Sequence, residues 1–119
     1  MESSLASKTI LSTIKGMLGV QEDVDAFDEE LLAYLNSAFL TLSQLGIGTN
    51  NKFMVDKYTL WGDFETQIPY EVLQTYLYLK VRLVFDPPQT HVVMDAMKSQ
   101  IQEYEWRLNA QVDYPWREE

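Results

Sequence analysis

One apolar run, residues 70–88, constrains the fold of this chain more than any other feature. It reads YEVLQTYLYLKVRLVFDPP, and Lys80 and Arg82 supply its only positive charges. Large apolar side chains recur on nearly every side of a helix drawn through it: Val72, Leu73, Tyr76, Leu77, Leu79, Val81, Leu83, Val84 and Phe85. A helix that is hydrophobic all round must be covered by other elements. The run therefore predicts the central helix of a small all-α domain.

Both ends of this predicted helix carry boundary signals. Pro69 can occupy the first helical position, where its missing N–H is not needed, and Glu71 complements the positive end of the helix dipole. Asp86 and the two prolines behind it end the helix, because proline cannot continue the hydrogen-bond ladder. A β-strand is the alternative interpretation, since β-branched and aromatic residues are frequent here. The length of the run favours a helix.

Two more helices are predicted before the central one. The first, residues 7–18, has an apolar face made of Ile10, Ile14 and either Met17 or Leu18. Ser7 is its expected N-cap, and Gly19 followed by an apolar residue is typical of a left-handed helix end. The second has an apolar stripe at three-to-four spacing: Phe27, Leu31, Tyr34 or Leu35, Ala38, Leu42 and Leu45. Gly46 and Ile47 repeat the same kind of ending.

Six carboxylates crowd the start of the second helix, between Glu22 and Glu30. An EF-hand calcium loop does not fit them, because its sixth position would be Asp28 instead of glycine and its twelfth would be Tyr34 instead of glutamate. Acidic residues are favoured at a helix N-terminus by the dipole, and Asp25 or Asp28 is the expected N-cap. No metal site is predicted.

Residues 46–68 lose helical periodicity, yet they hold too many large apolar side chains for a solvated loop. We expect Trp61 and Phe64 to fold back over the core. The remaining apolar residues could instead form an arm or β-ribbon that completes its burial on another subunit. The predicted subunit or tail-side interface consists of Phe53, Met54, Val55, Tyr58 and Leu60.

A fourth helix is predicted over residues 89–109. Its apolar stripe is Val93, Met97, Ile101, Tyr104 and Leu108, and Thr90 or Asp86 could be its N-cap. The chain then divides into a helical domain, residues 1–109, and a polar tail, residues 110–119. The aromatic residues of the tail suit either an interface or packing on the parent domain.

Composition excludes several classes of protein. The chain has no cysteine, which rules out disulfide frameworks and thiolate catalysis. Its formal charge of −9 has the wrong sign for a protein that grips nucleic-acid phosphates. No apolar run approaches the length of a membrane span, and the N-terminus MESSLASK lacks a basic flank followed by an apolar region. We expect a soluble protein with no membrane partner and no obvious export signal.

Parts needed for catalysis are missing from the sequence. His91 is the only histidine, and no serine lies in a G-x-S-x-G setting. The phosphate-binding glycine motifs G-x-x-x-x-G-K-[ST] and G-x-G-x-x-G do not occur. Glu103 and Glu105 would face different sides of a helix, so they would not converge as paired acids. The sequence predicts a protein that is not an enzyme, needs no cofactor and acts by assembly or binding.

Nearly the whole chain resembles the small head-tail connector proteins of long-tailed phages, the adaptor or head-completion family. The likeness runs through TILSTIKGMLGVQEDVDAFDEELLAYLNSAFLTLSQLGIG, the W-x-D-F residues 61–64, TYLYLKVRLVFDPP and EYEWRLNAQVD. The resemblance implies a structural protein of the virion neck, assembled in the host cytoplasm. It implies a homo-oligomeric ring, typically twelve copies in the virion, that completes the head below the portal protein after DNA packaging. The stopper, or tail-completion protein, would join from the tail side, and viral DNA would pass through the channel without specific binding.

Within that expectation, we assign portal docking to four residues of the tail because of its aromatic content: Val112, Tyr114, Pro115 and Trp116. Two other functions fit the residues less well. One is a helical protein-binding adaptor or regulatory subunit outside virions, using the same surfaces without forming a ring. The other is an acidic mimic of DNA, which would need carboxylates along one exposed face, whereas here they cluster at a helix start and at the chain ends.

Overall fold

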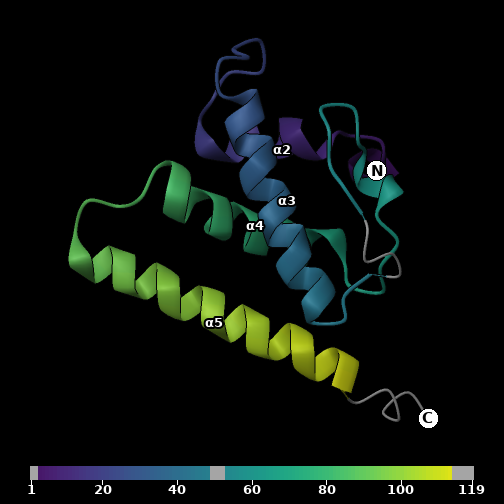
Figure 1. Cartoon of the computed structure of the whole chain (residues 1–119), viewed down its shortest axis with the longest axis vertical. Helices are drawn as coiled ribbons and strands as arrows, with labels where there is room; N and C mark the ends of the chain where they lie inside the picture. The colour runs from purple at the N-terminus through teal and green to yellow at the C-terminus, as the bar shows by residue number, and fades with distance from the viewer. Residues whose placement is uncertain (1–2, 49–52, 114–119) are drawn as a thin grey trace.

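The computed structural model describes residues 3–48 and 53–113, and these residues form an all-α fold (Figure 1). Its elements in chain order are α1 (Ser3–Ala6), α2 (Ile10–Leu18), α3 (Asp28–Gln44), the 3-10 helix η1 (Trp61–Asp63), α4 (Tyr70–Phe85) and α5 (His91–Asp113). No strand occurs in these two ranges beyond an isolated antiparallel bridge between Thr9 and Leu60. The predicted all-α class is therefore confirmed.

Helix α4 is the centre of the fold, as predicted. It packs against α2, α3 and α5, and its buried side chains include Leu73, Tyr76 and Leu77 (Figure 1). Pro69, expected inside the helix, instead lies one residue before it as the N-cap, with an extended ψ of 141°. The helix ends at the predicted place, where the Asp86 N–H donates to the Arg82 carbonyl.

Helix α2 begins later than predicted. Thr9, and not Ser7, is the N-cap, because its hydroxyl accepts a hydrogen bond from the Ser12 N–H at 3.1 Å. The bridge to Leu60 holds Thr9 in the extended conformation that an N-cap requires. At the other end Gly19 has the predicted left-handed conformation, with φ of 82°. There the Val20 N–H donates to the Lys15 carbonyl, which confirms the expected ending.

Helix α3 has its predicted end and most of its predicted stripe, but a different start. Phe27, expected in the stripe, is 41% exposed, because it precedes the helix as the N-cap residue. Leu31, Leu35 and Leu42 are buried, and Gly46 has φ of 86° where the helix stops. The expected side-chain cap is absent from this start: Phe27 is the N-cap residue and makes no capping hydrogen bond. The Asp28 carboxylate instead turns toward the Lys15 ammonium, at 2.9 Å.

Helix α5 is longer than predicted. Thr90 caps it, accepting from the Val93 N–H at 3.3 Å, and the helix continues to Asp113 instead of ending at residue 109. The residues 110–113 have no breaker that would stop a helix. Three of the predicted stripe residues, Met97, Ile101 and Leu108, are buried, whereas Val93 is exposed. Figure 1 shows that the first turn of α5, residues 91–94, extends past the end of α4.

The segment between α3 and α4 packs back on the helices. Trp61 and Phe64 are buried, which confirms the expectation for these two residues. The Trp61 indole N–H donates to the Thr13 hydroxyl at 3.0 Å, and its backbone N–H donates to the Lys8 carbonyl at 3.0 Å. None of the helices found in the described ranges combines the length and the hydropathy needed to cross a bilayer.

Candidate assembly surface

Residues 53–60 form an arm whose backbone is hydrogen-bonded to one side chain of α3. The Asn36 amide accepts from the Val55 N–H at 2.7 Å and donates to the Val55 carbonyl at 3.1 Å. One side chain thus satisfies both backbone groups of Val55, as a neighbouring strand would. Because buried backbone groups need such partners, Asn36 can hold the buried Val55 without a sheet.

The base of the arm is packed by three phenylalanines. The ring centroids of Phe39, Phe53 and Phe64 lie 4.8–5.1 Å apart, in tilted and edge-to-face arrangements that aromatic pairs favour. Gly48 makes room for this cluster, because a Cβ atom there would lie 2.8 Å from the Phe64 ring, and its φ of 88° also suits glycine. The base therefore belongs to the core of the subunit.

The tip of the arm is a turn held by hydrogen bonds around Asp56. Its carboxylate accepts from the Tyr58 N–H and from the Thr59 hydroxyl, both at 2.9 Å. The Thr59 hydroxyl in turn accepts from the Asp56 N–H at 2.9 Å. The Tyr58 N–H, followed by the Thr59 hydroxyl, lowers the pKa of Asp56 below its ordinary value. The turn is a local Asx-type structure, already formed before any partner arrives.

The arm presents two large apolar side chains to solvent, one on this turn and one two residues before it. Met54 is 70% exposed and Tyr58 is 75% exposed. The Lys57 ammonium lies 6.0 Å from the centroid of the Tyr58 ring. Isolated exposed apolar residues need no explanation, but two on one short arm form a candidate contact surface.

The structure separates the five residues predicted for the interface. Met54 and Tyr58 are exposed, Phe53 and Leu60 are half-buried, and Val55 is buried inside the subunit. Burial within one subunit does not test a contact between copies, so that contact stays a prediction. Of the five residues, Met54 and Tyr58 are the ones exposed enough to make it. Asn36 was not foreseen, because its partner is 19 residues away in an irregular segment.

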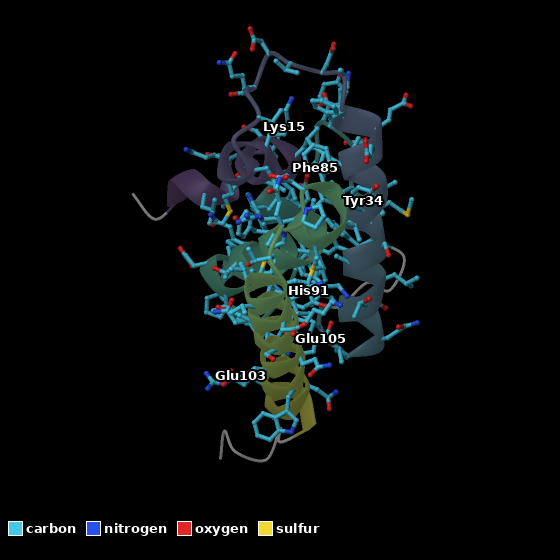
Figure 2. The ribbon with its side chains drawn as sticks, turned by 90° about the vertical axis from the view of Figure 1, so that its left-hand side faces the viewer. Lys15, Tyr34, Phe85, His91, Glu103 and Glu105 are labelled. Atoms are coloured by element: carbon cyan, nitrogen blue, oxygen red, sulfur yellow. The ribbon has the colours of Figure 1, made fainter. Side chains whose placement is uncertain are left out.

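Helix α5 touches the subunit through one face, and a polar cluster joins that face to α4. The Tyr76 hydroxyl donates to the Glu105 carboxylate at 2.7 Å, and the Lys80 ammonium lies 3.4 Å from the same oxygen. Burial, and then the hydrogen bond to Glu105, raises the pKa of Tyr76, so its hydroxyl stays protonated. Glu103 lies on another side of α5 and pairs with Arg107 at 2.7 Å (Figure 2). The two glutamates do not converge, as predicted.

The loop between α2 and α3 is anchored from beneath by Lys15. This lysine is only 3% exposed, and its ammonium donates to the carbonyls of Glu22 and Val24 at 3.0 and 2.6 Å (Figure 2). Asp28 completes its environment at 2.9 Å. Buried charge is tolerated when it is paired and hydrogen-bonded in this way. Sequence reasoning missed Lys15, although a lysine next to Ile14 on an apolar helix face was a visible signal.

Within residues 3–48 and 53–113, no cluster of three or more His, Cys, Asp or Glu side chains could hold a metal ion. His91 is exposed at the start of α5 (Figure 2). A surface hollow of about 220 Å³ on α5 is lined by Gln100, Glu103, Tyr104 and Arg107.

The predicted portal-docking residues lie outside what the structure describes. Tyr114, Pro115 and Trp116 fall beyond residue 113, and for Val112 only the backbone, as part of α5, is described. Their role stays a prediction.

Comparison with known proteins gives one result that bears on function. A protein-family model described as "Phage connector protein" matches residues 10–115, which run from the start of α2 past the end of α5. A search of curated proteins gives no match, and a search of solved structures gives none either.

Proposed function

The chain belongs to the phage connector protein family, and from this premise we propose that it forms a homo-oligomeric ring below the portal protein. In this role it completes the head after DNA packaging and receives the stopper protein on its tail side. The family consists of structural proteins of the phage neck, so the proposal gives the position and the partners of a structural role, and not a reaction.

The observation that carries this proposal is the exposed Tyr58 on a turn that is already ordered. Binding is weaker when a loop must become ordered on contact, and a pre-formed turn avoids that entropic cost. Tyrosine also supplies a large contact area with few rotatable bonds, which explains why it is enriched among residues that dominate interfaces. A ring requires one face of a subunit to meet a different face of the next, and the arm suits one of those faces.

The charge of the chain supports the passage of DNA through such a ring. A formal charge of −9 repels phosphates, so a wall made of this protein would not retain the viral DNA. The portal partner is assigned to the C-terminal residues, and the neighbouring copy or the tail-side stopper to the arm.

The first test is assembly with purified portal rings, observed by electron microscopy. Tyr58→Asp should abolish ordered rings while leaving the helical circular dichroism and melting temperature unchanged, because the side chain is exposed. The matched control is Val92→Asp, which places the same charge on an equally exposed apolar residue of α5. Normal rings with Tyr58→Asp would remove the arm from the interface, and loss with Val92→Asp alone would move the contact to α5.

The second test concerns the tail. Deleting residues 114–119 should leave a folded subunit that no longer binds portal rings. Unchanged binding by the truncated chain would contradict portal docking by Tyr114, Pro115 and Trp116.

A further inference from the structure

The loop that joins α2 to α3, residues 19–27, is arranged around a positive charge that belongs to the chain itself. Lys15 lies in the last turn of α2, and its side chain is only 3% exposed (Figure 2). Three oxygens lie around its ammonium: the carbonyls of Glu22 and Val24 at 3.0 and 2.6 Å, and the Asp28 carboxylate at 2.9 Å. The loop thus provides two of these oxygens, and the first residue of α3 provides the third.

The number and kind of these oxygens indicate which cation fits between them. A primary ammonium has three N–H donors, so three acceptor oxygens match it. A calcium ion takes about six to eight oxygen ligands, and this set is too small for it. Most acidic side chains of the segment stay outside the set, since Asp23 and Asp25 are exposed and Glu22 takes part through its backbone carbonyl. The surroundings of the Lys15 nitrogen therefore suit an ammonium group.

The charge of the ammonium is needed at this place, and not only the hydrocarbon part of Lys15. The Asp28 oxygen nearest to it is buried and accepts no hydrogen bond from the part of the chain that the structure describes, so the ammonium compensates its charge. The C-terminal end of a helix also favours a cation, because the negative end of the dipole lies there. A neutral side chain in place of Lys15 would leave two carbonyls without donors and a carboxylate without its counter-charge.

We propose that residues 22–28 form a binding site for a primary ammonium group, and that the chain fills this site with its own Lys15. The occupied site orders the backbone of the loop, which carries the exposed side chains of Val24 and Phe27. The three oxygens recognise N–H donors and a positive charge, and neither depends on the covalent link to α2. A free alkylammonium ion should therefore order the loop when the Lys15 side chain is removed. This inference does not depend on the proposed ring.

Hydrogen exchange of the full chain tests the need for the charge. The reporter is the Val24 N–H, which is hydrogen-bonded within the loop, and the reference is the Ile10 N–H at the other end of α2. Lys15→Met keeps a long side chain without its charge, and exchange at Val24 should quicken at least about tenfold more than exchange at Ile10. The matched control is Lys8→Met, which removes an exposed lysine just before the same helix and should leave both rates unchanged.

Rescue by a free amine is the decisive measurement. Lys15→Ala keeps only the Cβ atom of the side chain, and propylammonium supplies the missing carbons together with the ammonium. Propylammonium chloride should slow exchange at Val24 in this variant by at least about tenfold. Tetramethylammonium chloride at the same ionic strength screens exposed charges equally but has no N–H donor, so it should not slow the exchange. Lys15→Met should not respond to propylammonium, because its own side chain fills the space.

Three outcomes would overturn the inference. The first is exchange at Val24 in Lys15→Met as slow as in the parent chain, because the hydrocarbon part of the side chain would then suffice. The second is an equal effect of the two salts on Lys15→Ala, and the third is no effect of propylammonium on it. If Lys15→Ala is unfolded in plain buffer, the same two salts are compared by helical circular dichroism, and failure of propylammonium to restore the signal overturns the inference in the same way.

Discussion

Helices α4 and α5 are neighbours in the chain, yet the subunit covers them very differently. Helix α4 packs against α2, α3 and α5, and its side chains Leu73, Tyr76 and Leu77 have no exposed surface. Val84, expected to be covered as well, is 55% exposed near the end of the helix. Helix α5 is longer, but it rests on the subunit along one face and leaves Val92 and Trp106 in solvent. Figure 1 shows α5 at the margin of the fold, below α4.

The length of a helix therefore does not indicate how much of it is buried. Helix α4 is apolar on nearly every side, so its sequence requires neighbours within the subunit. Helix α5 has one apolar stripe and an opposite side on which a tryptophan, 71% exposed, stands among polar residues. The first helix holds the subunit together, whereas the second adds surface to it.

The largest expected effect comes from removing a side chain at the centre of α4. Leu77→Ala should lower the free energy of unfolding by about 2–5 kcal/mol, because it leaves a cavity where Leu77 is fully buried. The matched change on α5 is Trp106→Ala, which should alter that free energy by less than about 0.5 kcal/mol. Urea unfolding followed by circular dichroism measures both. Equal losses would mean that α5 is covered as fully as α4.

A smaller effect is expected at the polar cluster between the two helices. Tyr76→Phe removes the hydroxyl that donates to Glu105 and leaves a half-buried carboxylate with Lys80 alone. The loss in unfolding free energy should be about 1–3 kcal/mol, because an acceptor loses its partner away from bulk water. Hydrogen exchange should then quicken along α5 more than along α4. Faster exchange in α4 alone would show that the cluster does not attach α5.

The same tyrosine should give the subunit a distinct response to alkaline pH. Its pKa is raised in the folded state, so its contribution to stability is complete below the ordinary pKa of 10.0 and is lost as pH rises above that value. Above pH 10 the parent chain should lose stability relative to Tyr76→Phe by at most about 1.4 kcal/mol per pH unit. Urea unfolding of both chains between pH 8 and about 11 isolates this difference. Parallel curves would mean that folding does not raise the pKa of Tyr76.

The smallest effect is expected on the outer side of α5. Glu103→Gln breaks the exposed pair with Arg107, and such a pair four residues apart contributes about 0.3–0.5 kcal/mol. The melting temperature should barely change, and added salt should erase the difference. A loss comparable to that of Tyr76→Phe would contradict the assignment of Glu103 to the solvent side.

The sequence predicted best those elements whose signals are local. The apolar pattern of α4 and the prolines after Phe85 lie within the element itself, so its bounds were found almost to the residue. The start of α2 was missed because Ser7 and Thr9 are both suitable caps, and the distant bridge to Leu60 holds Thr9 in the capping conformation. The end of α5 was missed because residues 110–113 are polar but compatible with a helix.

The candidate site was predicted less well, for a physical reason. Hydrophobicity indicates that Val55 and Tyr58 are unusual for a loop, but it does not say whether the same chain or another one covers them. In the structure Asn36 draws Val55 inward, and Asp56 shapes the turn that leaves Tyr58 outside. Polar side chains determine both positions, and their hydrogen-bond partners follow no periodic pattern in the sequence.

The burial of the Lys15 ammonium has a practical consequence for chemical cross-linking of this protein to its neighbours. Carbodiimide reagents join a carboxylate to a nearby amine without adding a spacer, and they require both groups to be reachable. Lys15 touches the loop that carries Glu22 and Asp23, but its amine is shielded from reagent. An amide bond formed at that loop must therefore come from an amine elsewhere, and mass spectrometry of the linked peptides would identify which molecule supplied it.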